Sequence, residues 1–345
     1  MQKYALPAFL FGLGLAVVIV VWQGVDAVGA ALSHVGVQLL WLPPWFLISI
    51  ALAALAWGLI FPPGTSPGAP RIILATWIGM SINWLLPVAQ LGGDVAKGAW
   101  LARRAEPRAM MIAAALSDKI LQTATQALVA VTGVALLLAT SADTRLVPWV
   151  LGFATAVAVL VAAFMHLQKH GLLTRLASLA ERSYVRIAAR RGAPRSGQLA
   201  PLIGGAAGVD AGIRDCFGSP RRVGVYCIIR LTSRLVIAGE VWLVLYVAGH
   251  PVSVLEAMMI ECLTQTVRSA AFALPGAYGV QEGAFVLIGP LVGVPPEVAL
   301  SVSLAKRMRE IIIGVPGLVY LQLSEGLSAL RPVIPREPGP PSRPE

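Results

Sequence analysis

Seven apolar runs, each long enough to cross a lipid bilayer, restrict this 345-residue chain more than any other feature of its sequence. A helix of about 20 apolar residues spans the hydrocarbon core. Only 13% of the residues are charged, whereas soluble domains carry about 25%. The runs are Leu6–Trp22, Trp41–Phe61, Ala109–Ala139, Leu146–His166, Val223–Ala248, Val252–Leu274 and Ile311–Leu330. The sequence therefore predicts an all-α, polytopic integral membrane protein with about seven full transmembrane helices.

Two further apolar segments are interrupted. Ile72–Leu91 contains Pro87 and continues into the letters GGD, and Gly279–Val292 is short for a full span. Each is compatible with a full span or with a re-entrant hairpin, which enters and leaves the membrane on one side. Interrupting a helix in lipid frees backbone N–H and C=O groups, which are tolerated where protein buries them or where they line a water-filled cavity.

The two interrupted segments resemble each other in sequence. SINWLLPVAQLGGDVA begins at Ser81, and SAAFALPGAYGVQEGA begins at Ser269. In both, the Ser stands six residues before a Pro, and an acid, Asp94 or Glu282, stands seven residues after it. Broken segments at corresponding positions of two halves are the best sequence indication of a membrane transport site. We therefore predict an internal repeat whose two broken elements meet at a polar cavity, with Asp94 as the counterpart of Glu282.

The net charge of +10 is concentrated in one region. Residues 167–222 contain ten Lys and Arg against three Asp and Glu, and such basic loops stay in the cytoplasm. The basic segment Gly92–Arg108 should lie on the same side. With a cytoplasmic N-terminus, both assignments hold only if Ile72–Trp100 enters the membrane and returns.

A helix within the basic region is predicted to lie in the membrane interface. At 100° per residue, four arginines share one face and apolar residues share the other, which is typical of interfacial helices. The arginines are Arg175, Arg182, Arg186 and Arg190. Aromatic residues that would stack on nucleic-acid bases are almost absent, so anionic phospholipid headgroups are the expected partners. The alternative is a solvated loop that only fixes the topology.

Ionisable residues inside the apolar runs are the candidate functional groups, because a charge within a bilayer is costly. Those that lie deepest or beside a helix break are Asp94, Asp118, Arg234, Glu261 and Glu282. The alternative is that acids and bases form structural pairs between helices. Cysteine and histidine show no spacing typical of a metal site, so we expect no metal and no cofactor.

Three motifs resemble the transmembrane, flippase-like domain of lysylphosphatidylglycerol synthases. LPGAYGVQEGAF resembles that family's PGGxGxxE element, LLPVAQLGGDVAKGAWLARR its first broken element, and SDKILQ its short acid/base signature. GGDVAKG together with PGAYGVQEG is most similar to the stand-alone members associated with hopanoid biosynthesis in bacteria. The resemblance covers roughly residues 5–330. It implies that the site residues are Asp94, Lys97, Asp118, Lys119, Gly276, Gly279 and Glu282.

The resemblance implies one domain in the bacterial inner membrane, residues 1–334, that moves a lipid between leaflets, followed by a disordered Pro-rich tail at 335–345. A hopanoid-related lipid or a phospholipid is the implied cargo, and lipid-biosynthesis enzymes are the implied protein partners. Ala277 replaces the second glycine of the PGG element, and Lys119 stands where arginine is common, which weakens the substrate assignment. Because the sequence ends at Glu345, we expect no soluble aminoacyltransferase domain and no enzymatic activity. The alternatives are a membrane-embedded enzyme or accessory subunit acting on lipid headgroups, and a scaffold for lipid-synthesising enzymes.

Overall fold

The computed structural model describes residues 36–86, 92–140, 200–270 and 279–330, and all regular structure within them is helical. The elements are η2 (Val37–Trp41), α2 (Leu42–Ile60), α3 (Ala69–Leu85), α4 (Gly92–Ala102), α5 (Arg108–Thr140), α8 (Ala200–Phe217), α9 (Pro220–Val247), α10 (Val254–Ala270), α11 (Val280–Ile288), η5 (Gly289–Val292) and α12 (Pro296–Leu330). The predicted runs Leu6–Trp22 and Leu146–His166 and the Pro-rich tail lie outside the described residues.

Two of the described helices, Gln38–Ile60 and Arg108–Ala139, are long and apolar enough to cross a membrane. They correspond to the predicted runs Trp41–Phe61 and Ala109–Ala139. Charged side chains interrupt the apolar sequences of α9 and α12, and α10 has only 17 residues. Length and composition alone therefore do not mark these helices as spans.

A helical hairpin, formed by α3 and α4, lies where the sequence predicts a segment that turns back. Leu86 is extended (φ −107°, ψ 148°), and Pro87 has no N–H to continue the helix. The backbone N–H of Gly93 donates a hydrogen bond to Asn83 Oδ1 over 2.8 Å, and a Cβ on Gly93 would overlap the carbonyl oxygen of Gly79. With 11 residues, α4 is about 16 Å long, which is too short to span the bilayer core of about 30 Å.

The second half of the chain repeats the helix order of the first. In the first half α2, α3 and the short α4 precede the long α5; in the second, α9, α10 and the short α11 precede the long α12. α12 begins at Pro296 and α5 at Arg108, a separation of 188 residues (296 minus 108). The same separation relates Glu282 to Asp94. The repeat predicted from the interrupted segments therefore extends over four helices in each half.

Contacts between the halves follow the repeat. α3 packs against α12, and its counterpart α10 packs against α5. α2 packs along α9, its own counterpart. The hydroxyls of Ser49 and Ser233 share a hydrogen bond of 2.7 Å where these two helices meet. Each half therefore makes the same contacts with the other, as two units related by a two-fold rotation would.

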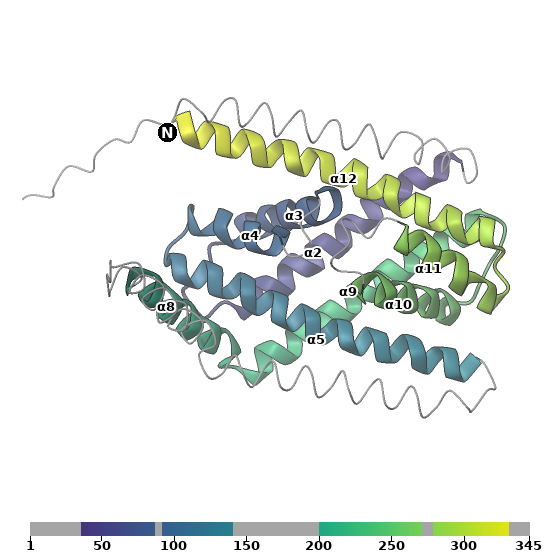
Figure 1. Ribbon diagram of the computed structural model, residues 1–345, viewed down its shortest axis with the longest axis horizontal. Coiled ribbons are helices and arrows are strands. Elements are labelled where there is room, and N and C mark those ends of the chain that lie inside the picture. The colour runs from purple at the N-terminus through teal and green to yellow at the C-terminus, as the bar shows by residue number, and fades with distance from the viewer. Residues whose placement is uncertain (1–35, 87–91, 141–199, 271–278, 331–345) are drawn as a thin grey trace, which may run out of the picture.

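The two halves run in opposite directions (Figure 1). α5 begins beside α4 at the left of the view and ends at the right, whereas α12 begins at the right beside α11 and ends at the upper left. The short helices α4 and α11 accordingly lie toward opposite ends of the bundle. Inverted repeats of this kind are common among membrane transporters.

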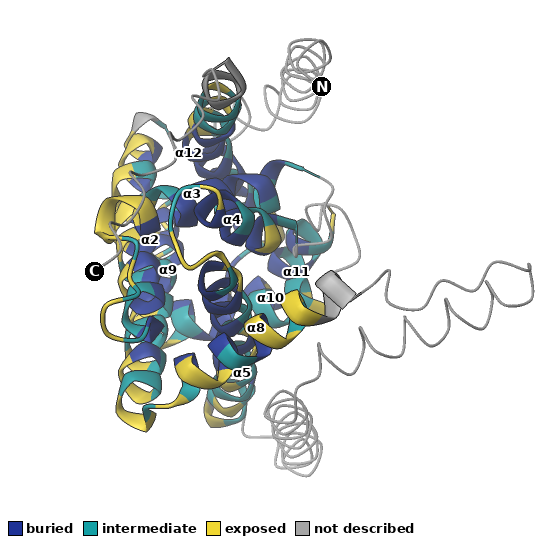
Figure 2. Cartoon of the chain, turned by 90° about the vertical axis from the view of Figure 1, so that its left-hand side faces the viewer, coloured by how far each residue is buried: buried dark blue, intermediate teal, exposed yellow. Residues whose placement is uncertain are grey.

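Buried residues face the spaces between helices, and much of the outside is exposed (Figure 2). One apolar cluster, which includes Trp57, Trp100 and Tyr226, joins helices around α4. A second cluster, which includes Phe285 and Met308, joins helices around α11. Many large apolar side chains on α2, α5, α9 and α12 are exposed. Such surfaces are unfavourable in water and suit contact with lipid.

The basic region 167–222, predicted to be a loop, contains the helix α8 and the first turn of α9. α8 packs against α5, and Val209 and Ile213 are buried in one cluster with Ala113 of α5. An apolar face therefore docks this part of the region on the bundle, which the count of charges did not predict.

Candidate functional site

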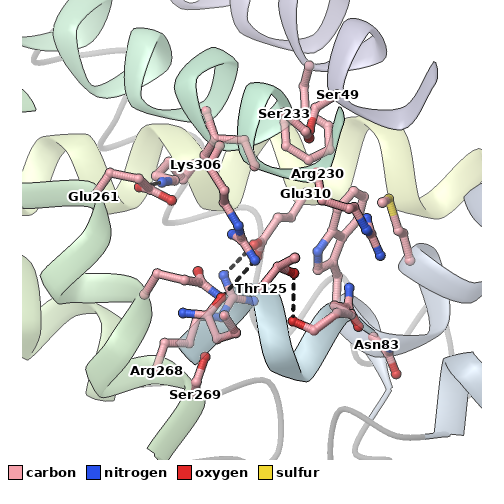
Figure 3. Close-up of a pocket in the computed structure, with 18 of the residues that line it drawn as sticks. Ser49, Asn83, Thr125, Arg230, Ser233, Glu261, Arg268, Ser269, Lys306 and Glu310 are labelled. Carbon is pink, nitrogen blue, oxygen red and sulfur yellow. Dashed lines mark hydrogen bonds and ion pairs between the residues drawn. The ribbon is translucent and has the colours of Figure 1, made fainter. Parts of the chain in front are cut away.

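A cavity of about 410 Å³ lies between helices of both halves (Figure 3). This volume is within the range of small-molecule sites, roughly 300–1,000 Å³. α2, α3, α5, α9, α10 and α12 all contribute to its walls. The lining residues are Phe46, Ser49, Met80, Asn83, Trp84, Lys119, Gln122, Thr123, Thr125, Gln126, Arg230, Ser233, Arg234, Ile237, Glu261, Gln265, Arg268, Ser269, Lys306, Arg309 and Glu310.

Positive charge predominates on the cavity wall. The cationic lining residues are Lys119, Arg230, Arg234, Arg268, Lys306 and Arg309, whereas the acidic ones are Glu261 and Glu310. Figure 3 shows Lys306 and Glu310 of α12 around the same space as Glu261 and Arg268 of α10. Uncharged polar residues occupy much of the remaining wall, and α5 contributes more of them than any other helix. The cavity is thus built to hold a polar, charged group.

Four predicted site residues form one ion cluster beside the cavity, which we call the α4 cluster: Asp94, Lys97, Asp118 and Lys119. Lys97 Nζ lies 2.9 Å from Asp94 Oδ1 and also bonds Asp118 Oδ2. Lys119 Nζ lies 2.9 Å from Asp94 Oδ2. Lys119 lines the cavity, so the cluster connects the cavity wall to the α3–α4 hairpin.

α9 completes the surroundings of Asp118. The hydroxyl of Tyr226 donates a 2.6 Å hydrogen bond to Asp118 Oδ1, and Arg230 Nη2 lies 3.4 Å from the same oxygen. Both Asp118 and Tyr226 are fully enclosed, with exposed fractions of 2% and 0%. A buried carboxylate needs such partners, because an unpaired charge away from water is strongly destabilising.

A second ion cluster, which we call the α11 cluster, lies in the other half. Gly279 is the N-cap of α11 with φ 77°, a conformation that favours glycine, and its backbone N–H donates to Glu282 Oε2 over 2.8 Å. Glu282 Oε1 lies 3.2 Å from Arg307 Nε. Arg307 and Arg268 both pair with Glu310, over 3.0 and 2.9 Å. Arg268 and Glu310 line the cavity.

The two clusters contain the same ion pair at equivalent positions. Asp94 pairs with Lys119, and Glu282 pairs with Arg307. Adding the separation of 188 residues to the first pair gives the second. In each half, an acid after the break therefore holds a cation on the long helix that follows.

Two further buried pairs border the cavity. Lys306 bonds Glu261, and Arg309 Nη1 lies 3.5 Å from Glu240 Oε2. The guanidinium of Arg309 also lies 3.7 Å from the centre of the Phe46 ring. That distance is within the range of a cation–π interaction, so the ring holds one face of the guanidinium.

The structure places the predicted site residues unevenly around the cavity. Lys119, Arg234 and Glu261 line it. Neither Asp94 nor Glu282 does; each instead holds a cation, and the Glu282 side chain is 21% exposed. Both acids therefore fit the alternative interpretation, in which acids and bases form structural pairs between helices.

Gly276 and the predicted lipid-binding arginines lie outside the described residues. These arginines are Arg175, Arg182, Arg186 and Arg190. The interfacial helix therefore stays a prediction.

Lys306 and Arg309 were missed because the last apolar run was predicted to begin too late. It was placed at Ile311–Leu330, after the charged letters KRMRE. α12 in fact begins at Pro296, so these letters lie well inside the helix and point toward its neighbours. A proline at the first position with Glu297 in the first turn is a helix-start pattern that could have revealed this.

Lys97 also differs from its predicted place. It was counted among the loop charges of Gly92–Arg108 that fix the topology. It belongs instead to α4 and is 5% exposed between its two carboxylate partners. The side chains of Arg103 and Arg108, at 64% and 74% exposed, lie on the surface and pair with Glu325 and Glu106.

The described residues offer charges and hydrogen-bond donors, and contain no group of three His, Cys, Asp or Glu side chains that could hold a metal ion. Their arrangement can bind and orient a charged group within an apolar bundle.

Comparison with known proteins identifies a family. The family model described as "Lysylphosphatidylglycerol synthase TM region" matches residues 9–317. This range contains every residue that lines the cavity and both ion clusters. No curated protein and no solved structure matches the chain.

Proposed function

Because the chain belongs to the lysylphosphatidylglycerol synthase transmembrane family, we propose that it moves a lipid between the leaflets of the bacterial inner membrane. The proposed cargo is a hopanoid-related lipid or a phospholipid, since the motifs GGDVAKG and PGAYGVQEG are most similar to the stand-alone, hopanoid-associated members. We propose a transporter without a cofactor and without enzymatic activity.

The observation that carries this proposal is the charged cavity between two inverted halves. A lipid headgroup cannot cross the hydrocarbon core without polar partners, because its hydrogen bonds to water have no replacement there. The cavity supplies such partners within a bundle whose outer side chains are largely apolar. In our proposal the headgroup passes through the cavity while the acyl chains stay in the bilayer.

The two equivalent ion pairs provide a means to alternate access. Asp94 and Lys119 join α4 to α5, and Glu282 and Arg307 join α11 to α12. Because α4 and α11 lie toward opposite ends of the bundle, separating one pair would open the cavity toward one leaflet. We propose that the pairs open in turn, as the two halves of inverted-repeat transporters do.

The proposed topology follows the distribution of charge. It comprises about seven full spans and two re-entrant segments, with the N-terminus and residues 167–222 in the cytoplasm. The proposed role of Arg175, Arg182, Arg186 and Arg190 is to gather anionic phospholipid at the cytoplasmic surface. Enzymes of lipid biosynthesis are the proposed protein partners.

Leaflet exchange in liposomes tests the proposed function. The full chain is reconstituted with a fluorescently labelled lipid, and a membrane-impermeant reductant then quenches the label in the outer leaflet. We expect wild-type protein to make inner-leaflet label accessible. The double variant Lys119→Gln/Arg307→Gln should slow exchange by at least about tenfold. It removes the ion pairs with Asp94 and Glu282, and the loss of a charge-assisted hydrogen bond is large enough to produce an effect of this size.

Glu106→Gln is the matched control, because Glu106 pairs with Arg108 on the exposed surface and its side chain is 71% exposed. It should exchange lipid at the wild-type rate. If wild-type protein exchanged lipid no faster than protein-free liposomes do, transport would be contradicted and a scaffold favoured. A headgroup of changed mass, detected by mass spectrometry, would instead favour an enzyme.

A further inference from the structure

We propose that the cavity is an oxyanion site that selects lipids bearing an anionic phosphodiester headgroup, recognised by Arg234, Arg309 and Gln126. This proposal rests on the proposed function and names the substrate class of that site. It follows from three properties of the cavity wall: its unsatisfied hydrogen-bonding groups, its charge balance and its apolar surface.

The buried hydrogen-bonding atoms on the wall that lack a partner are all donors. Among the described lining residues they are Gln126 Nε2 and Arg309 Nε; Arg309 Nη1 makes no hydrogen bond either, but it lies 3.5 Å from Glu240 Oε2. Gln126 has a fixed orientation, since its Oε1 accepts a 2.8 Å hydrogen bond from Arg234 Nη2 and arginine can only donate. Buried donors without acceptors are costly, so a ligand that brings acceptor oxygens would stabilise this wall.

The excess of positive charge on the cavity wall also favours the binding of an anion. Arg234 makes no ion pair with any described residue, whereas every other cationic lining residue does. The buried and half-buried residues in and around the cavity wall include eight cations and six acids. The cations are Lys97, Lys119, Arg230, Arg234, Arg268, Lys306, Arg307 and Arg309, and the acids are Asp94, Asp118, Glu240, Glu261, Glu282 and Glu310. A bound anion would offset this excess, which is otherwise unfavourable in a low-dielectric interior.

Phosphate is the anion that this donor set fits best within a membrane. Guanidinium groups donate in a planar fork that matches phosphate oxygens. The Phe46 ring covers one face of the Arg309 guanidinium, and Glu240 and Glu310 lie beside its two terminal nitrogens. The Nε–H makes no hydrogen bond, and in our proposal it donates to a ligand oxygen. A headgroup that also carries an ammonium would bring a further cation to a wall already rich in them.

Apolar wall residues favour a lipid over free phosphate. Phe46, Met80, Trp84 and Ile237 line the cavity beside the charged groups, and the hydrophobic effect would add to the binding of a glycerol-linked chain. Inorganic phosphate would use only the donors. We therefore expect a short-chain anionic phospholipid to bind more tightly than inorganic phosphate.

Titration of the purified full chain in a neutral detergent tests the proposal. The probes are short-chain phosphatidylglycerol, short-chain phosphatidylcholine and inorganic phosphate, and binding is followed by isothermal titration calorimetry. Wild-type protein should prefer phosphatidylglycerol to phosphatidylcholine by at least about tenfold, the size expected for charge-assisted hydrogen bonds. Arg234→Gln and Gln126→Leu should each reduce this preference, whereas Arg108→Gln, on the exposed surface, should retain it.

Size-exclusion chromatography of each variant separates loss of binding from misfolding. Arg234 is suited to this test because its one hydrogen bond to a described residue is to an amide, so no carboxylate loses its partner. Equal affinity for the two phospholipids would overturn the proposal. Inorganic phosphate binding as tightly as phosphatidylglycerol would overturn the lipid source and indicate a soluble phosphate.

Leaflet exchange separates this proposal from the proposed function. Exchange of neutral lipid alone would contradict the oxyanion site and leave transport supported. Selective binding of phosphatidylglycerol without any exchange would support the oxyanion site and contradict transport.

Discussion

At the scale of single residues, equivalent positions of the two halves do not always carry the same charge. Lys97 contacts Asp118 in the first half. The residues 188 positions further on are Phe285 and Lys306, and Lys306 Nζ lies 5.4 Å from the Phe285 ring centre. An ion pair in one half thus corresponds to a cation–π contact in the other. The backbone repeat is therefore kept while the charges are redistributed, which gives the cavity its positive excess.

Asp118→Asn should be among the most damaging single changes in the chain. It leaves Lys97 and Arg230 with less compensating charge inside the bundle, and breaking a buried pair in this way costs about 3–5 kcal/mol. We expect a clear fall in the midpoint of thermal unfolding in detergent. Glu106→Gln, in an exposed pair, should change stability by less than about 1 kcal/mol. Equal midpoints for both variants would show that the α4 cluster is not required for stability.

At the scale of elements, the interruptions depend on glycine as well as proline. Pro316 lies inside α12, and the helix continues through it. After the second interruption, Gly279 with positive φ starts α11, and in the first hairpin Gly93 lets α4 approach α3 closely. A proline alone therefore does not end a helix here, because neighbouring helices can satisfy the freed backbone groups. A start in the left-handed region and a close backbone approach each require a residue without a Cβ.

Gly93→Ala should separate α3 from α4. The added Cβ would overlap the carbonyl oxygen of Gly79 and lie 2.7 Å from the Asn83 side chain, and such overpacking typically costs about 1–3 kcal/mol. Thermal unfolding in detergent measures the change. Gly204→Ala is the control, because its Cβ meets nothing within 4 Å, and alanine favours a helix by up to about 1 kcal/mol. Unchanged stability of Gly93→Ala would contradict the close approach.

At the scale of the whole molecule, the two halves of the bundle are inverted relative to each other. α4 and the start of α5 lie at one end of the bundle, and α11 and the start of α12 lie toward the other (Figure 1). A cavity between inverted halves can be reached in equivalent ways from either leaflet. Two halves in the same orientation would offer two entrances on one side only.

Cysteine labelling in whole cells tests the inversion. Single cysteines replacing Ser66 and Arg103 should react from the same side of the membrane, and a cysteine replacing Glu297 should react from the opposite side. All three positions are exposed. Burial raises the pKa of the Cys216 thiol to about 11, so a maleimide at neutral pH should leave it unreacted. Cys227 is partly exposed and is replaced by alanine in every variant.

Positions 66 and 103 serve as each other's control, because they flank the same hairpin. Labelling of them from opposite sides would mean that α3 and α4 cross the membrane together as a span. Labelling of all three positions from one side would mean that the halves are not inverted.

Part of the site could be predicted from the sequence because the repeated motif is local. Asp94 and Glu282 stand at fixed distances from a proline, so their equivalence needed no knowledge of packing. Gln122 and Gln126 continue the helix face of Asp118, and both line the cavity. Lys306 and Arg309 could not be assigned from the repeated motif, because their burial depends on how far α12 extends before the charged letters; only the helix-start pattern at Pro296 indicates that extent.

The sequence by itself determined the helical class of the described residues, the positions of two interruptions and the acid that follows each. These features follow from apolar run length, helix-breaking residues and spacing, which act over short stretches of chain. Only the tertiary structure decided that the halves are inverted and that both acids hold cations instead of lining the cavity. It also decided that Arg234 lacks a carboxylate partner. Periodicity gives the faces of a helix, whereas the neighbour of each face depends on packing between segments far apart in sequence.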